Sequence, residues 1–321
     1  MLSILAITAP IYAVAAIGFL CTRAGLFQRT DMRVLGKFVV NLALPALLFN
    51  ALAQRSVAEV LEPVFIGAYA LGSLGANLAG VWWARRVAGK PLPAAAIVGM
   101  GMSCPNSGFI GFPLMAQLFG PVNAGIGLAL AMVVENFLTL PLSLALADSA
   151  PAAGAAGQGR GERLRSALAQ SLRGIVRNPM IWGIALGFLF SLAGWHLAPP
   201  LARTVDLFAV ACASLALFVI GGSLVGISAQ GLARDVTVIA IGKLLLHPLL
   251  VLAAVLLLPP MARDLQVMVV LMAAVPMLGI YPVLAQKHGQ ETMAAAAQLT
   301  ATVVSFFTLG LAVWAAQTFA R

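Results

Sequence analysis

The sequence predicts an all-α integral membrane protein with ten transmembrane helices, arranged as two inverted five-helix repeats whose broken fourth and ninth helices cross. Three observations predict this class. Of the 321 residues, 61% are hydrophobic and 9% are charged, whereas soluble domains carry roughly 25% charged residues. The apolar residues form runs long enough to cross a bilayer. Several motifs recur in the same order in the two halves of the chain.

Ten apolar segments account for most of the chain. A helix rises about 1.5 Å per residue, so about 20 apolar residues cross the ~30 Å hydrocarbon core of a bilayer. The expected helices are residues 4–21, 34–53, 63–83, 94–119, 121–147, 175–195, 203–228, 236–258, 265–287 and 292–318. The first segment has basic residues after it and none before it, the reverse of a secretory signal peptide, so we expect a retained helix.

The basic residues indicate how the chain is oriented. The formal net charge is +9 at pH 7. With the N-terminus outside, all of the 19 lysines and arginines except Arg55, Arg203, Arg263 and Arg321 fall at cytoplasmic ends. This distribution follows the positive-inside rule. We therefore expect a multi-pass protein of the cell (inner) membrane with both termini on the outer side. The positive net charge is therefore explained by the orientation of the chain in the membrane, and no nucleic-acid partner is expected.

A polar connector divides the chain into two halves. Residues 148–174 contain APAAGAAGQGRGERLRS, a composition that indicates a flexible cytoplasmic linker. It separates a first five-helix repeat, 1–147, from a second, 175–321. NLALPALLF aligns with SLALFVIGG, and the prolines of the fourth segment align with those of the ninth. Because each repeat has an odd number of spans, the second enters the membrane from the opposite side, as in many secondary transporters.

Two segments are apolar enough to cross the bilayer but contain helix-breaking residues. They read GMSCPNSGFIGFPLMAQ (101–117) and AAVPMLGIYPVLAQ (273–286). Proline removes a backbone donor, and unpaired backbone groups are tolerated at membrane depth only inside protein or beside a wet cavity. We expect new half-helices to start near Pro113 and near Pro282, with both N-termini at the membrane centre. Ordinary proline kinks are the alternative.

Two crossed helix N-termini predict an anion site. Each N-terminus offers unpaired amides and roughly half a positive charge, so the pair suits one carboxylate. Amide and hydroxyl side chains at the breaks can add neutral donors, and glycines let a ligand approach the backbone. The candidate substrate-binding residues are Asn106, Ser107, Gly108, Gly111, Pro113, Gly279, Tyr281 and Pro282.

At these residues the sequence resembles the auxin efflux carrier family, which includes plant auxin exporters and bacterial carriers of malonate and related acids. The matching stretches are NLALPALLF, PNSGFIGFPL, LALFVIGGSL, KLLLHPLL and GIYPVLAQKHG, and the similarity covers essentially the whole chain. The resemblance implies a fold similar to sodium–bile acid symporters, with helices 1, 2, 6 and 7 as a scaffold unit, helices 3–5 and 8–10 as a transport unit, and often a homodimer. It also implies that Pro113 and Pro282 are the crossover prolines and that Asn106 binds the ligand. The matching place in the ninth segment holds Met277 and Leu278, without an amide.

Four polar residues inside the expected helices are candidates for coupling, because a charge at the bilayer centre costs at least about 2.5 kcal/mol. Burial favours the protonated form of an unpaired carboxyl, so Glu135 is a candidate proton carrier. The alternatives are a structural role, paired with a neighbouring amide or with Lys243, and sodium ligation together with Asn136. Lys243 and His247 share a helix face. Lys243 either extends to the cytoplasmic surface or supplies a cation for a dicarboxylate, and His247 is either a packing or a coupling residue.

The sequence favours a secondary transporter of small organic anions that works by alternating access in the lipid bilayer. The coupling ion is left open between H⁺ and Na⁺, and a transport-dead sensor with the same fold is a further alternative. No Walker motif is present, so ATP is not the expected driver. An enzyme is not expected, because Glu135 is the only clearly central acid and no HExxH-like spacing occurs. No cofactor or metal is expected either, since the three cysteines have no metal-ligand spacing.

Overall fold

The computed structural model describes residues 2–53, 61–148, 176–226 and 233–319, and these residues fold almost entirely as helices. Among them, six helices are long and apolar enough to cross a membrane, and four shorter apolar helices accompany them. The expectation of an all-helical protein with several membrane spans is therefore confirmed. The expected linker at 148–174 lies outside the described residues except for Asp148.

Helices occupy each of the predicted segments, with boundaries within a few residues of those expected. In chain order they are α1 (Leu2–Arg23), α2 (Arg29–Phe38), α3 (Leu44–Ala53), α5 (Pro63–Arg86), α6 (Leu92–Ser103), α7 (Phe112–Phe119), α8 (Pro121–Val134), α9 (Leu140–Ala147), α11 (Pro179–Ala193), α12 (Pro199–Ser223), α13 (Ala233–Ile241), α14 (His247–Leu257), α15 (Arg263–Ala274), α16 (Tyr281–Gln286) and α17 (Glu291–Phe319). Four π-helical turns interrupt them: η1 (Val39–Ala43), η2 (Ser107–Gly111), η3 (Glu135–Thr139) and η4 (Gly242–Leu246).

Each π-helical turn is followed, two residues later, by a proline. These prolines are Pro45, Pro113, Pro141 and Pro248. A proline ring clashes with the carbonyl group four residues earlier, and in every case that residue is the middle one of the π-helical turn. Widening the turn by one residue relieves the clash without ending the helix. Proline therefore explains where these spans deform, including the turns that carry Glu135 and Lys243.

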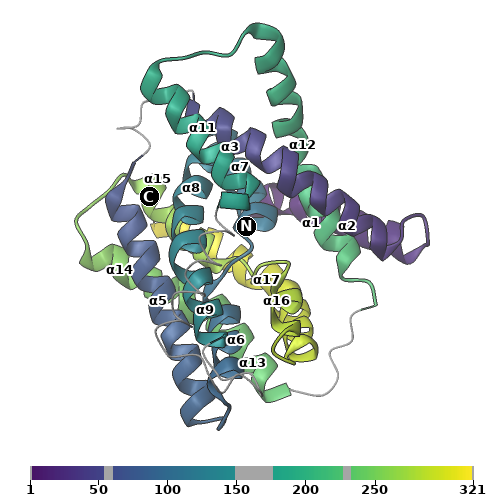
Figure 1. The fold of residues 1–321 in the computed structure, drawn as a ribbon, viewed down its shortest axis with the longest axis vertical. Coiled ribbons are helices and arrows are strands. Elements are labelled where there is room, and N and C mark those ends of the chain that lie inside the picture. Colours follow the sequence, from purple (N-terminus) through teal and green to yellow (C-terminus); the bar gives the residue numbers. More distant parts are fainter. Residues whose placement is uncertain (1, 54–60, 149–175, 227–232, 320–321) are drawn as a thin grey trace, which may run out of the picture.

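The helices pack in two groups (Figure 1). In the first, α1 packs along α12 and α3 along α11, with α2 also against α12. In the second, α5 packs against α6 and α14, α6 against α9, and α17 against α13 and α16. Helices α7 and α8 lie between the groups, since α8 contacts both α3 and α5 and α7 contacts α1. The segments thus pair across the two halves of the sequence rather than within each half alone.

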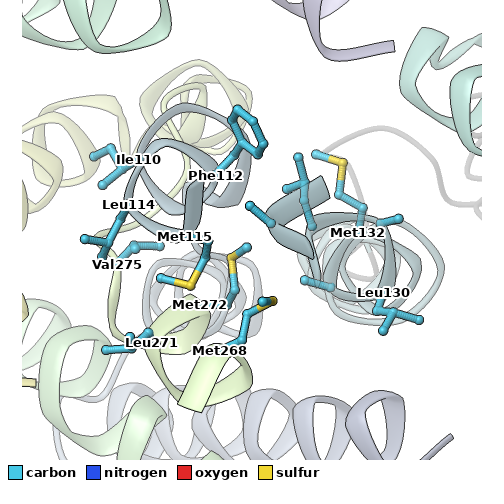
Figure 2. Packing of buried hydrophobic residues seen from close by; sticks show 14 of the residues in the cluster. Ile110, Phe112, Leu114, Met115, Leu130, Met132, Met268, Leu271, Met272 and Val275 are labelled. Carbon is cyan, nitrogen blue, oxygen red and sulfur yellow. The ribbon is translucent and has the colours of Figure 1, made fainter. Parts of the chain in front are cut away.

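The centre of the molecule is filled by flexible apolar side chains from three helices. Met115 of α7 and Met268 and Met272 of α15 lie close together in Figure 2, and Met132 of α8 belongs to the same cluster on the neighbouring helix. Met115, Met268 and Met272 are fully buried, with exposures of 0%. Unbranched methionine side chains adapt to irregular gaps, which suits a core built around interrupted helices.

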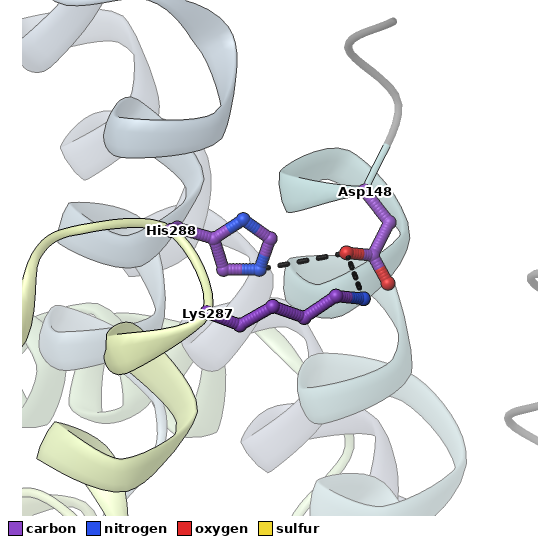
Figure 3. A network of polar contacts seen from close by, with 3 residues as sticks. All are labelled: Asp148, Lys287 and His288. Atoms are coloured by element: carbon purple, nitrogen blue, oxygen red, sulfur yellow. Dashed lines mark hydrogen bonds and ion pairs between the residues drawn. The ribbon is translucent and has the colours of Figure 1, made fainter. Parts of the chain in front are cut away.

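A polar cluster joins the turn after α16 to the end of α9. Lys287 Nζ lies 2.8 Å from Asp148 Oδ1, and His288 Nε2 lies 3.5 Å from the same oxygen (Figure 3). The cluster fastens the end of the ninth segment to the end of the fifth.

Candidate functional site

The two breaks lie against each other. The first break, 104–106, separates α6 from η2, and the second break, 275–280, separates α15 from α16. Pro105 and Met277 form an antiparallel bridge. The Asn106 amide donates to the Pro276 carbonyl at 2.8 Å, and the Leu278 amide donates to the Cys104 carbonyl at 3.0 Å. Each break therefore satisfies backbone groups that the other leaves free, as burial at membrane depth requires.

The half-helix after the first break starts earlier than expected. It begins at Ser107, and the Asn106 carbonyl accepts bonds from the amides of Ile110 and Gly111. The expectation of a start near Pro113 was wrong, because Asn106 adopts the non-helical conformation of an N-cap residue and begins the helix itself. Pro113 instead follows the π-helical turn η2. After the second break, Pro282 is the second residue of α16, as expected, but α16 has only 6 residues. Its dipole is therefore weaker than that of the longer half-helix.

The side chain of Asn106 is buried at the crossing and is not hydrogen-bonded to any described residue. Only 5% of the residue is exposed, and it makes no side-chain cap bond to its own helix. Buried polar groups in proteins almost always have a partner. An amide in this position is a donor available to a ligand.

The three candidate glycines differ in surroundings. A Cβ added at Gly108 would lie 3.0 Å from a methyl group of Leu44, and one at Gly111 would lie 2.8 Å from the Met272 sulfur. These two glycines permit close packing. Gly279 is exposed, and a Cβ there would meet no atom closer than 3.7 Å. It is the one of the three candidates where space for a ligand remains.

Ser107 and Glu135 are bonded to each other. The Ser107 hydroxyl donates to Glu135 Oε1 at 2.5 Å, and the Tyr69 hydroxyl of α5 donates to the same oxygen at 2.7 Å. The carboxyl at the start of η3 thus binds the first turn after the first break. Ser107 offers its hydroxyl to Glu135 in this conformation rather than to a ligand.

Asn136 points to a different neighbour. Its Nδ2 donates to the Met132 carbonyl, and its Oδ1 accepts a 2.9 Å bond from Asn178 Nδ2 at the start of α11. Glu135 and Asn136 are therefore not brought together as a pair of oxygen ligands. Among the described residues, no group of three or more His, Cys, Asp or Glu side chains is placed to hold a metal ion.

Lys243 does not extend to the cytoplasmic surface. It is fully buried, with an exposure of 0%, and its Nζ donates to the Ala273 carbonyl at 2.6 Å. Of the two alternatives for Lys243, the surface anchor does not match the structure, because α15 ends at Ala274 and its last carbonyls have no partner within the helix. A cation is favoured at that end by the helix dipole.

His247 continues this chain of contacts. Its Nδ1 lies 3.0 Å from Lys243 Nζ and its Nε2 lies 2.9 Å from the Ser73 hydroxyl. A charged lysine can only donate, so when Lys243 is protonated Nδ1 is the acceptor and Nε2 carries the proton that faces Ser73. Both ring nitrogens are satisfied, which agrees with the packing alternative for His247.

Tyr281 also lies in the core. It is fully buried, and its hydroxyl donates to the Ile97 carbonyl of α6 at 2.9 Å. A Cβ at Gly101 would collide with the same ring, so Gly101 makes room for it. In this structure Tyr281 packs α16 against α6 rather than facing a ligand, and Pro282 beside it is partly buried.

Sequence reasoning missed three polar residues around the crossing. Tyr69 and Ser73 are four residues apart on α5 and bond Glu135 and His247, respectively. That spacing on one helix face was a signal available in the sequence. Gln298 of α17 donates to the Gly279 carbonyl at 3.1 Å. The sequence pattern did not single it out, because Gln317 is a second amide in the same apolar span.

Comparisons with known proteins agree with a transporter. A family model described as "Membrane transport protein" matches residues 3–315. The "Uncharacterized transporter YfdV" of Escherichia coli (strain K12) is 24% identical over 299 residues, covering 92% of each chain. A protein of Rhizobium meliloti (strain 1021) named "Putative malonate transporter" is 26% identical over 263 residues, covering 78% of this chain and 76% of that protein.

Proposed function

Because the chain belongs to the family of membrane transport proteins that includes the auxin efflux carriers, we propose that it is a secondary transporter of small organic anions. Carboxylates such as malonate or auxin-like weak acids are its expected substrates. The name of the Rhizobium meliloti relative supports this class. Nothing in the proposal needs a cofactor or a metal.

The observation that carries this proposal is Asn106, a buried residue at the crossing of the two breaks whose side-chain amide has no hydrogen-bond partner among the described residues. The helix that starts at Ser107 directs its first free amides to the same place. A helix N-terminus attracts anions, and a side-chain amide adds a neutral donor whose geometry suits a carboxylate oxygen. The short helix α16 contributes less to this attraction.

The packing supports a division into a scaffold unit and a transport unit. The scaffold would comprise α1–α3, α11 and α12, and the transport unit α5–α9 and α13–α17, corresponding to helices 1, 2, 6 and 7 and helices 3–5 and 8–10 of the ten-helix scheme. In this scheme each unit takes helices from both inverted repeats, which a cytoplasmic linker joins. Both termini face outward, and two copies form a homodimer. The transport unit would carry the crossing from one side of the membrane to the other.

Glu135 is the proposed proton carrier. Its Oε1 accepts bonds from Ser107 and Tyr69, so its protonation state acts directly on the turn that follows the first break. Loss or gain of the proton would therefore be felt at the ligand site. Sodium coupling is the competing mechanism, and the separate contacts of Glu135 and Asn136 favour the proton.

Uptake into proteoliposomes tests the proposal. Labelled malonate, propionate and indole-3-acetate are supplied at pH 5.5 and pH 7.5, with and without Na⁺, to wild type and to Asn106→Ala. We expect at least one acid to enter in wild type and none in the variant. Asn123→Ala is the matched control, because Asn123 lies on α8 and its amide bonds only the Phe119 carbonyl among the described residues.

The outcomes separate the alternatives. Flux that depends on pH and is unchanged without Na⁺ supports proton coupling, whereas loss of flux without Na⁺ supports a sodium symporter. Binding of the acids without flux identifies a sensor. Equal uptake by wild type and Asn106→Ala contradicts the assignment of the site.

A further inference from the structure

Two side-chain amides approach Gly279 from different elements. Asn106 comes from the first break, and Gln298 comes from α17, whose Nε2 donates to the Gly279 carbonyl at 3.1 Å. Gly279 lies in the second break and is exposed. Residues far apart in sequence thus meet where the backbone has no helical structure.

A single point beside Gly279 lies within reach of both amides. A Cβ placed on Gly279 would have Asn106 Nδ2 at 3.7 Å and Gln298 Nε2 at 3.9 Å. Apart from Gly279 and its chain neighbours, no other described heavy atom comes within 4 Å of that point. The point is thus faced by two nitrogen donors.

The donors in this space are only partly used. Each amide nitrogen carries two hydrogens. Gln298 donates one of these hydrogens to the Gly279 carbonyl, and Asn106 donates neither hydrogen to a described residue. An acceptor atom placed between them would receive a bond from each side, and a carboxylate oxygen is the strongest common acceptor of this kind.

The site presents neutral donors, and the nearby buried cation is engaged elsewhere. Lys243 is fully buried and bonds Ala273 and His247. Because Lys243 Nζ is directed toward Ala273 and His247, a second carboxylate group close to the first would lack a direct ion pair with it. This favours a ligand that presents one ionised carboxylate.

We propose that Gln298 is a second ligand-binding side chain, which forms an amide clamp with Asn106 around one carboxylate, and that Gly279 keeps the clamp open. The preferred substrate class is a monocarboxylate, or a dicarboxylate carrying one proton. This inference rests on the proposed function, and it names a residue that the sequence pattern did not indicate.

Substitutions at Gln298 and Gly279 test the clamp. The probe is whichever of propionate, indole-3-acetate and malonate raises the thermal unfolding midpoint of purified wild type most, and its Kd is measured by titration. Gln298→Leu removes one donor to a charged group, and we expect Kd to rise about tenfold or more. Gln298→Glu, which has nearly the same shape, replaces the donor with a like charge and should abolish binding at pH 7.5.

Gly279→Ala adds a steric test. Its methyl group would fill the space between the amides at ordinary contact distances, so the fold should be kept and binding lost. Gly310→Ala is the matched control, because a Cβ there meets no atom within 4 Å. Gln266→Leu is the control for Gln298, since Gln266 also donates to a backbone carbonyl, that of Met261.

The results distinguish this inference from the proposed function. Loss of affinity in the Gln298 and Gly279 variants, with wild-type affinity in both controls and cooperative ligand-free unfolding in every variant, supports the clamp. Wild-type affinity in Gln298→Leu and Gly279→Ala, together with loss in Asn106→Ala, overturns the clamp and leaves the transporter in place. A wild type that neither binds nor transports any of the three acids overturns both. Tighter binding of fully ionised malonate than of propionate overturns the substrate class.

Discussion

The ammonium group of Lys243 donates to the carbonyl oxygen of Ala273, at the point where α15 stops before the second break. A helix that ends inside the protein leaves carbonyl groups without partners. Here a buried side chain from the π-helical turn η4 supplies the missing donor. The widened turn that Pro248 imposes on the eighth segment and the break in the ninth are therefore joined by one contact.

Replacing Lys243 with methionine should destabilise the fold. The change keeps an apolar stem of similar length but leaves the Ala273 carbonyl and His247 Nδ1 unsatisfied, which costs about 1–3 kcal/mol per buried group. The thermal unfolding midpoint in detergent measures the loss. Lys37→Met is the control, because Lys37 is exposed. An unchanged midpoint in Lys243→Met would show that the contact with Ala273 contributes nothing to stability.

Glu135→Gln should remove the pH dependence of transport and leave the protein folded. A glutamine oxygen can still accept the hydroxyl bonds of Tyr69 and Ser107, but the side chain can no longer exchange a proton. Uptake by proteoliposomes between pH 5.5 and pH 8 is the measurement. Tyr69→Phe is the companion variant: it keeps the carboxyl and removes one of its bonds, so its profile should shift rather than flatten. A wild-type profile in Glu135→Gln would assign the proton to another group.

Hydropathy and proline were enough to place the helices and the two breaks, whereas the π-helical turns η1, η3 and η4 were not predicted. The expected segments coincide with helices, and Pro105 and Pro276 lie at breaks, because proline acts on the turn in which it sits. The start at Ser107 was not predicted, because Pro113 is also suited to the first turn of a helix and competes with the N-cap preference of Asn106. Even so, that preference is readable in the sequence.

The polar contacts around the crossing were less predictable. Lys243 bonds a carbonyl 30 residues away and Tyr69 bonds a carboxyl 66 residues away. Such pairs depend on how helices pack, and hydropathy contains no information about which polar atoms face one another. Apolar helices also gave Gln298 no pattern from which its direction toward Gly279 could be inferred.

His288, at the end of the ninth segment, should make the stability of the fold depend on pH. Partial burial lowers the pKa of His288 below its usual value of about 6.5. The negative charge of Asp148 raises this pKa, and the positive charge of Lys287 lowers it further. The folded protein then binds fewer protons at His288 than the unfolded chain, so stability falls as pH drops below about 6.5. Between pH 7.5 and pH 5.5, the thermal unfolding midpoint of His288→Gln should fall by less than that of wild type. His196→Gln, at an exposed position, should behave like wild type, and parallel curves for all three proteins would contradict the prediction.

Gly221 sets the distance between α1 and α12. A Cβ at Gly221 would collide with the Ala15 carbonyl, and one at Gly18 would collide with the Phe218 carbonyl. The two backbones touch through these glycines, as small residues allow in membrane helix pairs. Gly221→Ala must push the helices apart, and overpacking of this kind costs about 1–3 kcal/mol. The thermal unfolding midpoint should fall accordingly.

A second glycine gives the opposite sign for the same substitution. Gly310 lies in α17 with open space where a Cβ would go, so alanine there gains helix propensity of up to about 1 kcal/mol and meets no obstacle. We therefore expect Gly310→Ala to raise the unfolding midpoint slightly and Gly221→Ala to lower it. Equal midpoint shifts in the two variants would mean that the contact between α1 and α12 does not cause the loss of stability in Gly221→Ala. The close backbone contact is present at Gly221 and absent at Gly310.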